Sequence, residues 1–354
     1  MTFCTTARKI FPIFIFVFLS FLHQAYAQKK QFEIACVGFY NLENLFDTIN
    51  QVDVIDEEFT PNGTKKWNYT KYQDKLGRLA DVISGVGKSQ TPDGLAFFGA
   101  AEIENRGVLE DLVKQPKLLN QNYQIVHFDS PDARGIDVAF LYQAKYFTLL
   151  DAHPVPMVKV DTSEDNRKTR DILVVHGIFK GDHIYVMVNH WPSRRGGERT
   201  TAPFRNTAAG ICKQISDSIR TQDPSAKVIV MGDLNDDPIN DSMLKYLRAN
   251  GDRATCLGNG FYNPFMKFYK DGNGTLAYQD AWSLFDQIIM SCGLANSNAT
   301  GWKFYQAGIY KQPWMVQTSG RYEGYPLRTF DGDTYMYGYS DHFPTYLYLI
   351  KEKN

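Results

Sequence analysis

The sequence has 354 residues, with 38 lysines and arginines against 39 aspartates and glutamates, so its formal net charge is −1. A hydrophobic fraction of 44% and a charged fraction of 22% are typical of a globular protein. They exclude a disordered or collagen-like chain. The balanced charge also excludes a protein that binds nucleic acid through bulk positive charge alone.

Residues 1–27 have the pattern of a secretory signal peptide. Arg8 and Lys9 precede an apolar run at 10–22, and a small-x-small cleavage site follows at Ala25-Tyr26-Ala27. The alternative is an uncleaved membrane anchor, but the run of about 13 residues is shorter than the roughly 20 that a membrane span needs. We therefore expect a secreted or periplasmic protein with no stable membrane insertion. Cleavage removes two positive and no negative charges, which moves the formal net charge to −3.

Four cysteines remain after the predicted cleavage, namely Cys36, Cys212, Cys256 and Cys292. Export makes disulfides possible, and four cysteines allow three pairings. None has the CxxC spacing of a zinc-thiolate site. Because several of them lie in or beside strand-like or helix-like apolar runs, we expect buried thiols, although the sequence leaves their oxidation state open.

The rest of the chain, residues 28–354, reads as one α/β domain without a linker or an internal repeat. Apolar runs predict strands at 32–39, 94–101, 123–128, 136–142, 147–150, 172–179, 183–189, 227–231, 285–290 and 345–350. Helical periodicity predicts helices at 70–86, 108–119, 207–219 and 241–247. Thr70 and Gln73 have the spacing of a capping box at the start of the first helix.

Two regions read as loops. Residues 250–277 contain three Asn-Gly turn signals, and residues 305–339 are rich in tyrosine and glycine without a clear period. Aromatic side chains in the second loop could stack on a substrate, or they could simply cover the edge of the core.

Polar residues recur where the predicted apolar strands end. These places carry Asn41, Glu102, Asn189 with His190, Asp233 with Asn235, Asp286, and Asp341 with His342. A carboxylate or imidazole at the end of a buried strand is costly unless it is paired or coordinated. Several oxygen ligands that converge suggest a hard divalent cation, and the neighbouring Asp and His suggest proton transfer.

The order of these motifs resembles the endonuclease/exonuclease/phosphatase family, the metal-dependent phosphodiesterases and phosphatases related to DNase I. The matching segments are NLENLFD (41–47), AEIEN (101–105), RGIDVAFLY (134–142), NHWPSR (189–194), GDLN (232–235), FDQIIMS (285–291) and SDHFP (340–344). NLENLFD and NHWPSR are most similar to its secreted bacterial nuclease-like branch. The resemblance implies a four-layer α/β sandwich of two packed mixed β-sheets.

The resemblance also implies the roles of the site residues. A divalent cation, Mg²⁺ or else Mn²⁺ or Ca²⁺, would be held by Glu102, Asn41 and Asp341. The catalytic residues would be His342 with its orienting carboxylate Asp286, Asp233 for the attacking water, Asn235 for a phosphate oxygen, and His190 for the phosphate or the leaving group. Whether His342 or Asp233 is the base stays open.

Three arginines are candidate contacts for the phosphates of a substrate. Arg134, Arg194 and Arg195 are candidates for binding phosphate through forked hydrogen bonds, although the two neighbouring arginines could belong to a solvated loop. The leading hypothesis is a secreted metal-dependent endonuclease that acts on DNA or RNA by in-line water attack. The alternatives are the same chemistry on a phospholipid, sphingomyelin or inositol phosphate, and a non-catalytic binding protein on the same fold. No obligate protein partner is evident.

Overall fold

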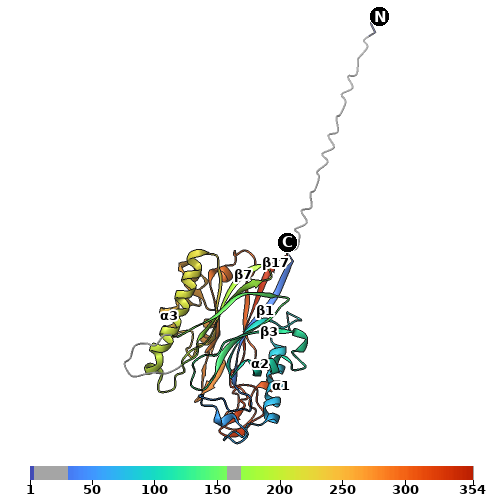
Figure 1. Ribbon diagram of the computed structural model, residues 1–354. Coiled ribbons are helices and arrows are strands. Elements are labelled where there is room, and N and C mark those ends of the chain that lie inside the picture. The colour runs from blue at the N-terminus through green and yellow to red at the C-terminus, as the bar shows by residue number, and fades with distance from the viewer. Residues whose placement is uncertain (4–30, 158–168, 354) are drawn as a thin grey trace. The chain divides into compact units, whose positions relative to one another are not determined.

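A computed structural model (Figure 1) describes residues 1–3, 31–157 and 169–353. The chain divides into two compact units, Met1–Gln31 and Phe32–Asn354, and the second unit holds all of the secondary structure described below. The predicted signal peptide lies almost wholly outside the described residues and stays a prediction. Within the described ranges, no helix has the length and apolar character needed to cross a membrane.

The first sheet has six strands in the order β14-β17-β1-β2-β4-β3. Their bounds are Phe32–Leu45 (β1), Leu95–Ile103 (β2), Tyr123–His127 (β3), Asp137–Gln143 (β4), Lys303–Ile309 (β14) and Thr345–Glu352 (β17). The pair β1 and β2 is parallel, whereas β1 with β17 and β2 with β4 are antiparallel, so the sheet is mixed.

The second sheet has seven strands in the order β5-β6-β7-β8-β13-β10-β9. Their bounds are Phe147–Val155 (β5), Ile172–Phe179 (β6), Asp182–His190 (β7), Lys227–Asp233 (β8), Ala249–Asn250 (β9), Phe261–Tyr262 (β10) and Asp286–Met290 (β13). The parallel pair β7–β8 lies between antiparallel pairs, so this sheet is also mixed.

Three hydrophobic clusters separate four layers. In β8, Ile229 and Met231 belong to the cluster between the two sheets, while Val228 and Val230 pack with α3 (Glu198–Gln222). The first sheet makes the corresponding outer contact with α1 (Tyr69–Gly85) and α2 (Arg106–Val113). Figure 1 shows these helices on the outer faces of the two sheets. Because both faces of the central strands are buried, they appear in the sequence as continuous apolar runs. The predicted four-layer sandwich is confirmed.

Short elements lie within and between the two regions that the sequence predicts to be loops. They are a 3₁₀ helix at Arg253–Gly258, α4 (Phe265–Lys270), α5 (Cys292–Ala295), a 3₁₀ helix at Pro313–Met315, and two hairpins, β11 (Leu276–Tyr278) with β12 (Ala281–Ser283) and β15 (Phe330–Asp331) with β16 (Thr334–Tyr335). Further 3₁₀ helices lie at Glu57–Phe59 and Leu119–Gln121, and a π-helix at Ser242–Leu247 replaces the predicted helix at 241–247. Most of these elements are too short to show a period in the sequence.

Three of the predicted helices differ from the predictions in their bounds or caps. The helix predicted at 108–119 is α2, which begins two residues earlier and ends at Val113. The cap of α1 is Asn68, whose side chain accepts the backbone N–H of Lys71, so the predicted capping box at Thr70 is wrong. The helix α3 begins nine residues earlier than predicted, at Glu198, and includes Pro203. A proline removes one backbone donor and normally marks a boundary, but in the second turn of a long, well-packed helix that loss is tolerated.

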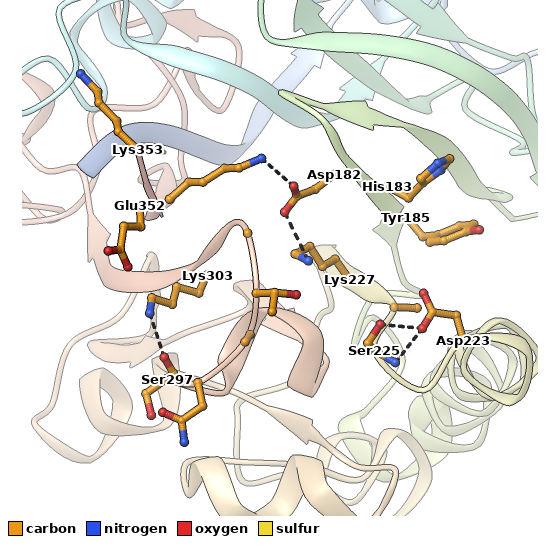
Figure 2. Close-up of a pocket in the computed structure, with 16 residues that line it drawn as sticks. Asp182, His183, Tyr185, Asp223, Ser225, Lys227, Ser297, Lys303, Glu352 and Lys353 are labelled. Atoms are coloured by element: carbon orange, nitrogen blue, oxygen red, sulfur yellow. Dashed lines mark hydrogen bonds and ion pairs between the residues drawn. The ribbon is translucent and has the colours of Figure 1, made fainter. Parts of the chain in front are cut away.

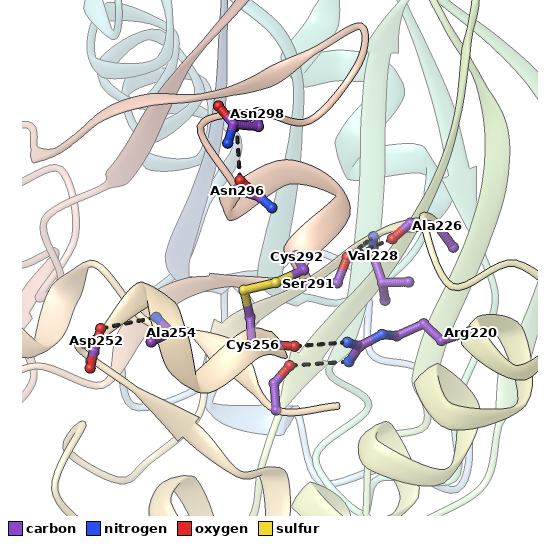
Figure 3. The surroundings of a disulfide bond; sticks show 11 residues. Arg220, Ala226, Val228, Asp252, Ala254, Cys256, Ser291, Cys292, Asn296 and Asn298 are labelled. Atoms are coloured by element: carbon purple, nitrogen blue, oxygen red, sulfur yellow. Dashed lines mark hydrogen bonds between the residues drawn. A yellow bond between two sulfur atoms is a disulfide. The ribbon is translucent and has the colours of Figure 1, made fainter. Parts of the chain in front are cut away.

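The expectation of buried thiols holds for Cys36 and Cys212 and is wrong for the other pair. Cys256 and Cys292 form a disulfide that joins the 3₁₀ helix at Arg253–Gly258 to α5 (Figure 3). Arg220 of α3 donates to the carbonyl of Cys256 at 3.1 Å and to that of Gly260 at 3.0 Å, which ties the same loop to the helix. The two cysteines are 36 positions apart, and nothing in the sequence indicates that they lie close together.

Candidate active site

The ends of three neighbouring strands bring the predicted catalytic residues together. Parallel pairing of β7 with β8 places His190 beside Asp233, and antiparallel pairing of β8 with β13 places Asp286 opposite Asp233. The Nε2 atom of His190 lies 3.6 Å from Oδ2 of Asp233. All three side chains are buried. The end of the second sheet therefore carries a compact polar cluster.

The loop before β17 brings His342 to this cluster. Its Nδ1 atom lies 2.7 Å from Oδ2 of Asp286, and its Nε2 atom lies 3.9 Å from Oδ2 of Asp233. The hydroxyl of Ser340 accepts the backbone N–H of His342 and donates to the carbonyl of Asn41 at 2.7 Å. These two hydrogen bonds of Ser340 link the SDHFP motif at 340–344 to Asn41, the first residue of the NLENLFD motif.

The two histidines of the site are driven to opposite charge states. Burial alone would lower the pKa of His342, but the carboxylates of Asp286, Asp233 and Asp341 outweigh it and raise that pKa well above its usual range. Burial and the guanidinium groups of Arg170 and Arg134 hold the pKa of His190 well below its usual range. At neutral pH, His342 is therefore an imidazolium and His190 is a neutral imidazole.

Asp233 is the residue that the others surround. Its Oδ2 accepts the side-chain amide of Asn41 at 3.0 Å, and its Oδ1 accepts the backbone N–H of Asn235 at 3.1 Å. Burial raises the pKa of Asp233 to about 7, the charged His342 opposes this rise, and the nearby carboxylates of Asp286 and Glu102 add to it. A carboxylate with a pKa near neutrality can accept a proton from water more readily than an ordinary one.

An irregularity in the first sheet positions Glu102. The register of β2 shifts between Ala101 and Ile103, and Glu102 has a left-handed φ of 61°. Such a bulge turns a side chain away from the regular strand direction, and left-handed backbone in a non-glycine residue is common at functional sites. One carboxylate oxygen of Glu102 accepts the backbone N–H of Asn44 at 2.9 Å, and the other lies 3.8 Å from Nε2 of His190.

With this geometry in view, comparison with known proteins identifies the family. The model of the Endonuclease/Exonuclease/phosphatase family matches residues 36–351, nearly the whole of the folded unit. The chain belongs to this family. Its members hydrolyse phosphoester bonds, and the predicted resemblance is confirmed at the family level. None of the curated proteins compared with the sequence matches it.

Solved structures of the endonuclease/exonuclease/phosphatase fold are similar over their whole length. A protein of the family from Bacteroides thetaiotaomicron is 16% identical, with a TM-score of 0.53, and the match covers 91% of this chain and 97% of that chain. TDP2 from D. rerio, complexed with a single-strand DNA product, is 13% identical, with a TM-score of 0.51 and coverages of 89% and 98%. At these identities the likeness supports the fold alone.

Acidic side chains gather at the site, and ligand atoms of Asp233, Asp286 and His342 lie within 4.8 Å of one another, close enough to share a metal ion. Glu102 offers one oxygen that is beyond hydrogen-bonding distance of His190, and Asp341 lies on the other side of the cluster, with one oxygen 3.9 Å from Nε2 of His342. Burial would raise the pKa of Asp341, but His342, Arg328 and Lys75 outweigh it and lower that pKa, so Asp341 is anionic. A buried oxygen of Asp286 has no hydrogen-bond partner among the described residues. Oxygen donors of this kind suit Mg²⁺, Mn²⁺ or Ca²⁺.

The three predicted arginines occupy different surroundings. Arg194 donates to the carbonyl of Asn235 and to the carboxylates of Asp236 and Asp237 at 2.9–3.3 Å, so it supports the turn after β8. Arg195 is exposed. Arg134 is half-exposed and lies close enough to His190 to lower its pKa. Phosphate contact by Arg134 and Arg195 stays a prediction. Arg194 uses its guanidinium to hold the turn that follows β8.

Two buried polar groups beside the site were not selected from the sequence. Arg170 donates to the carbonyls of His190 and Trp191 and fixes the end of β7. The fully buried amine of Lys75 donates to the hydroxyl of Thr329 at 2.5 Å, and that hydroxyl donates to Glu43 at 2.7 Å. Nothing in the local sequence around Arg170 or Lys75 distinguishes them from surface cations. Only the fold reveals their burial.

A separate pocket of about 1010 Å³ lies at the opposite ends of the same strands (Figure 2). Asp182 and Lys227, at the starts of β7 and β8, line it. The amines of Lys227 and Lys351 lie 3.3 and 2.8 Å from the carboxylate of Asp182, so these charges are already paired. Because His190 and Asp233 occupy the other ends of β7 and β8, this pocket is not part of the candidate active site.

Proposed function

We propose that this protein is an exported, divalent-metal-dependent phosphodiester hydrolase, and specifically a nuclease that cleaves DNA or RNA. The observation that carries the proposal is the position of Asp233, a buried carboxylate within 4 Å of both a neutral and a charged imidazole. A strand-end carboxylate that served only as a structural cap would not need this surrounding.

The chain's own residues supply a complete set of roles for water attack on phosphorus. Asp233 accepts a proton from the attacking water, because its pKa lies near neutrality. The imidazolium of His342, oriented by Asp286, stabilises negative charge that develops on the phosphoryl group. Asn41 and Asn235 hold the two oxygens of Asp233 in place. A cation held by Glu102 and Asp341 would polarise a phosphoryl oxygen and screen the leaving oxygen.

These charge states favour Asp233 over His342 as the base. An imidazole whose pKa is raised by three carboxylates carries its proton at neutral pH and is a proton donor or an electrostatic partner. Nucleic acid is favoured as the substrate because one structural neighbour, TDP2 from D. rerio, is complexed with a single-strand DNA product. The lipid or inositol phosphate alternative needs only a different binding surface around the same centre.

The direct test is a panel assay of purified residues 28–354. We expect cleavage of single-stranded DNA, duplex DNA or RNA with Mg²⁺, and loss of that cleavage with EDTA that is restored by added Mg²⁺. Activity confined to sphingomyelin, phospholipid or inositol phosphate would assign the alternative substrate class. Equal hydrolysis with Mg²⁺ and with EDTA would refute metal dependence, and inactivity on every substrate would refute the hydrolase proposal.

Export is supported by the disulfide as well as by the predicted signal peptide. Disulfides persist in oxidising compartments and are rare in the cytosol. Protein recovered from its host should therefore begin at Gln28, and alkylation of the unfolded, unreduced chain should label Cys36 and Cys212 but leave Cys256 and Cys292 unlabelled. Mass spectrometry of the intact protein and its peptides gives both results. Export would be contradicted by a chain that begins at Met1 and in which all four cysteines after the predicted cleavage site are labelled.

A further inference from the structure

We propose that a pocket beside Asp341 binds a nucleobase next to the scissile phosphate. This tyrosine pocket, a cavity of about 180 Å³, is lined among others by Tyr278, Asp280, Arg321, Tyr322, Tyr325 and Arg328. The inference rests on the proposed function and narrows it, because a base-binding subsite makes the substrate a nucleic acid and not a lipid.

The tyrosine pocket adjoins the catalytic centre. Asp341 is itself one of its lining residues, and the guanidinium of Arg328 donates to Asp341 at 2.9 Å. On its other side, Asp341 lies 3.9 Å from Nε2 of His342. A group in the pocket is therefore separated from the site of phosphate chemistry by a single side chain. This is the spacing expected for a nucleoside attached to the phosphate that is cleaved.

The walls of the tyrosine pocket are fixed before any ligand binds. One wall is the turn of the β11–β12 hairpin, where Gln279 and Asp280 both have left-handed φ angles, of 49° and 63°. The hydroxyl of Tyr325 donates to the carboxylate of Asp280 at 2.8 Å and accepts its backbone N–H at 2.6 Å. The opposite wall contains Tyr325, whose backbone carbonyl accepts the N–H of Gln317 at 2.9 Å. A preformed pocket loses less conformational entropy on binding.

The chemistry of the lining favours a base over the headgroup of sphingomyelin. The guanidinium carbons of Arg321 and Arg328 lie 5.5 and 6.0 Å from the ring centroid of Tyr322, whose ring is 5.6 Å from that of Tyr325. Aromatic faces combined with arginines suit stacked bases and their phosphates. A quaternary ammonium also prefers aromatic faces, but here it would meet two guanidinium groups. The pocket's carboxylates, Asp280 and Asp341, are already engaged by Tyr325 and Arg328.

The test compares short single-stranded DNA substrates that carry one abasic tetrahydrofuran residue at successive positions around the scissile phosphate. For the wild-type protein, removal of the base that occupies the tyrosine pocket should lower kcat/KM on the order of tenfold. In Tyr322→Leu this penalty should shrink to less than about twofold, because the stacking partner is already missing. Tyr322→Phe keeps the ring and should keep the penalty. Tyr246→Leu, at an exposed tyrosine outside the pocket, should behave as the wild type does.

Each outcome has a distinct consequence. Cleavage by the wild type with a base penalty that is the same in Tyr322→Leu overturns the tyrosine pocket and leaves the proposed function standing. If the wild type cleaves the substrates and removal of a base lowers kcat/KM at no position, the tyrosine pocket is likewise overturned and the proposed function stands. If the wild type cleaves no oligonucleotide at all, both the proposed nuclease function and the pocket are overturned. Circular dichroism of each variant verifies that it is folded.

Discussion

Replacement of His342 by alanine should lower kcat for phosphodiester hydrolysis by about 10²–10⁴-fold. The substitution removes the only charged imidazole that the described residues place at the site. Negative charge that develops on the phosphoryl group then loses the positive group that stabilises it. KM should change less, because phosphate would still meet the cation and the neighbouring side chains. Steady-state kinetics on the best substrate of the panel measures both constants.

Two controls separate catalysis from folding. Asp286 is fully buried and loses its hydrogen-bond partner in His342→Ala, so thermal melting must be measured alongside activity. His153→Ala is the matched variant, because His153 makes a similar contact to Asp151, at 3.0 Å, on the exposed surface. His153→Ala should retain full activity. Folded His342→Ala protein with kcat within about twofold of the wild type would contradict a catalytic role.

The catalytic residues can be predicted from the sequence because each of them lies at or near the end of an apolar strand, where a polar side chain is conspicuous. Asp233 and Asp286 each stand at the end of a buried apolar run, where an unpaired carboxylate is costly. Once the fold is a sandwich of mixed sheets, neighbouring strands bring such ends together. The pairing of Asp286 opposite Asp233 in the register follows from that arrangement.

The parts that escaped prediction depend on contacts between distant segments. Thr329 and Glu43 are 286 positions apart in the sequence, yet they form two hydrogen bonds of 2.7 Å beneath the site. Lys75 belongs to a helix with an ordinary amphipathic pattern, and its burial against Thr329 leaves no local signal. The sequence at 305–339 is compatible with an aromatic loop that stacks on a substrate or with one that covers the edge of the core. The contact between Tyr325 and Asp280, which are distant in the sequence, shows that the loop forms a wall of a pocket.

Replacement of Glu102 by glutamine should raise the Mg²⁺ concentration needed for half-maximal activity by at least about 10–100-fold. The change preserves the shape of the side chain and its acceptance of the Asn44 N–H, but it replaces the carboxylate oxygen that lies 3.8 Å from Nε2 of His190 by part of a neutral amide. At saturating Mg²⁺ part of the activity should return, because Asp233 and His342 are unchanged. Titration of activity against Mg²⁺ measures the shift.

Glu104→Gln provides the matched control from the same motif. Glu104 is buried, accepts the backbone N–H of Asp47, and has a pKa raised to about 8, chiefly by burial. Since a carboxyl with that pKa is mostly protonated at pH 7, its replacement by a neutral amide should alter the Mg²⁺ titration little. A larger shift for Glu104→Gln than for Glu102→Gln would show that the wrong glutamate has been assigned.

The most direct test of the metal-assisted site is an anomalous difference map from crystals that contain Mn²⁺. We predict a peak within about 2–2.5 Å of a carboxylate oxygen of Glu102, on the side that faces Asp341, and its disappearance in Glu102→Gln. Besides Asp233, Asp286 and His342 at the site itself, the described residues contain one further cluster that could hold a metal, His127 with Asp129 and Asp137. A peak at that cluster with none beside Glu102 would contradict the account.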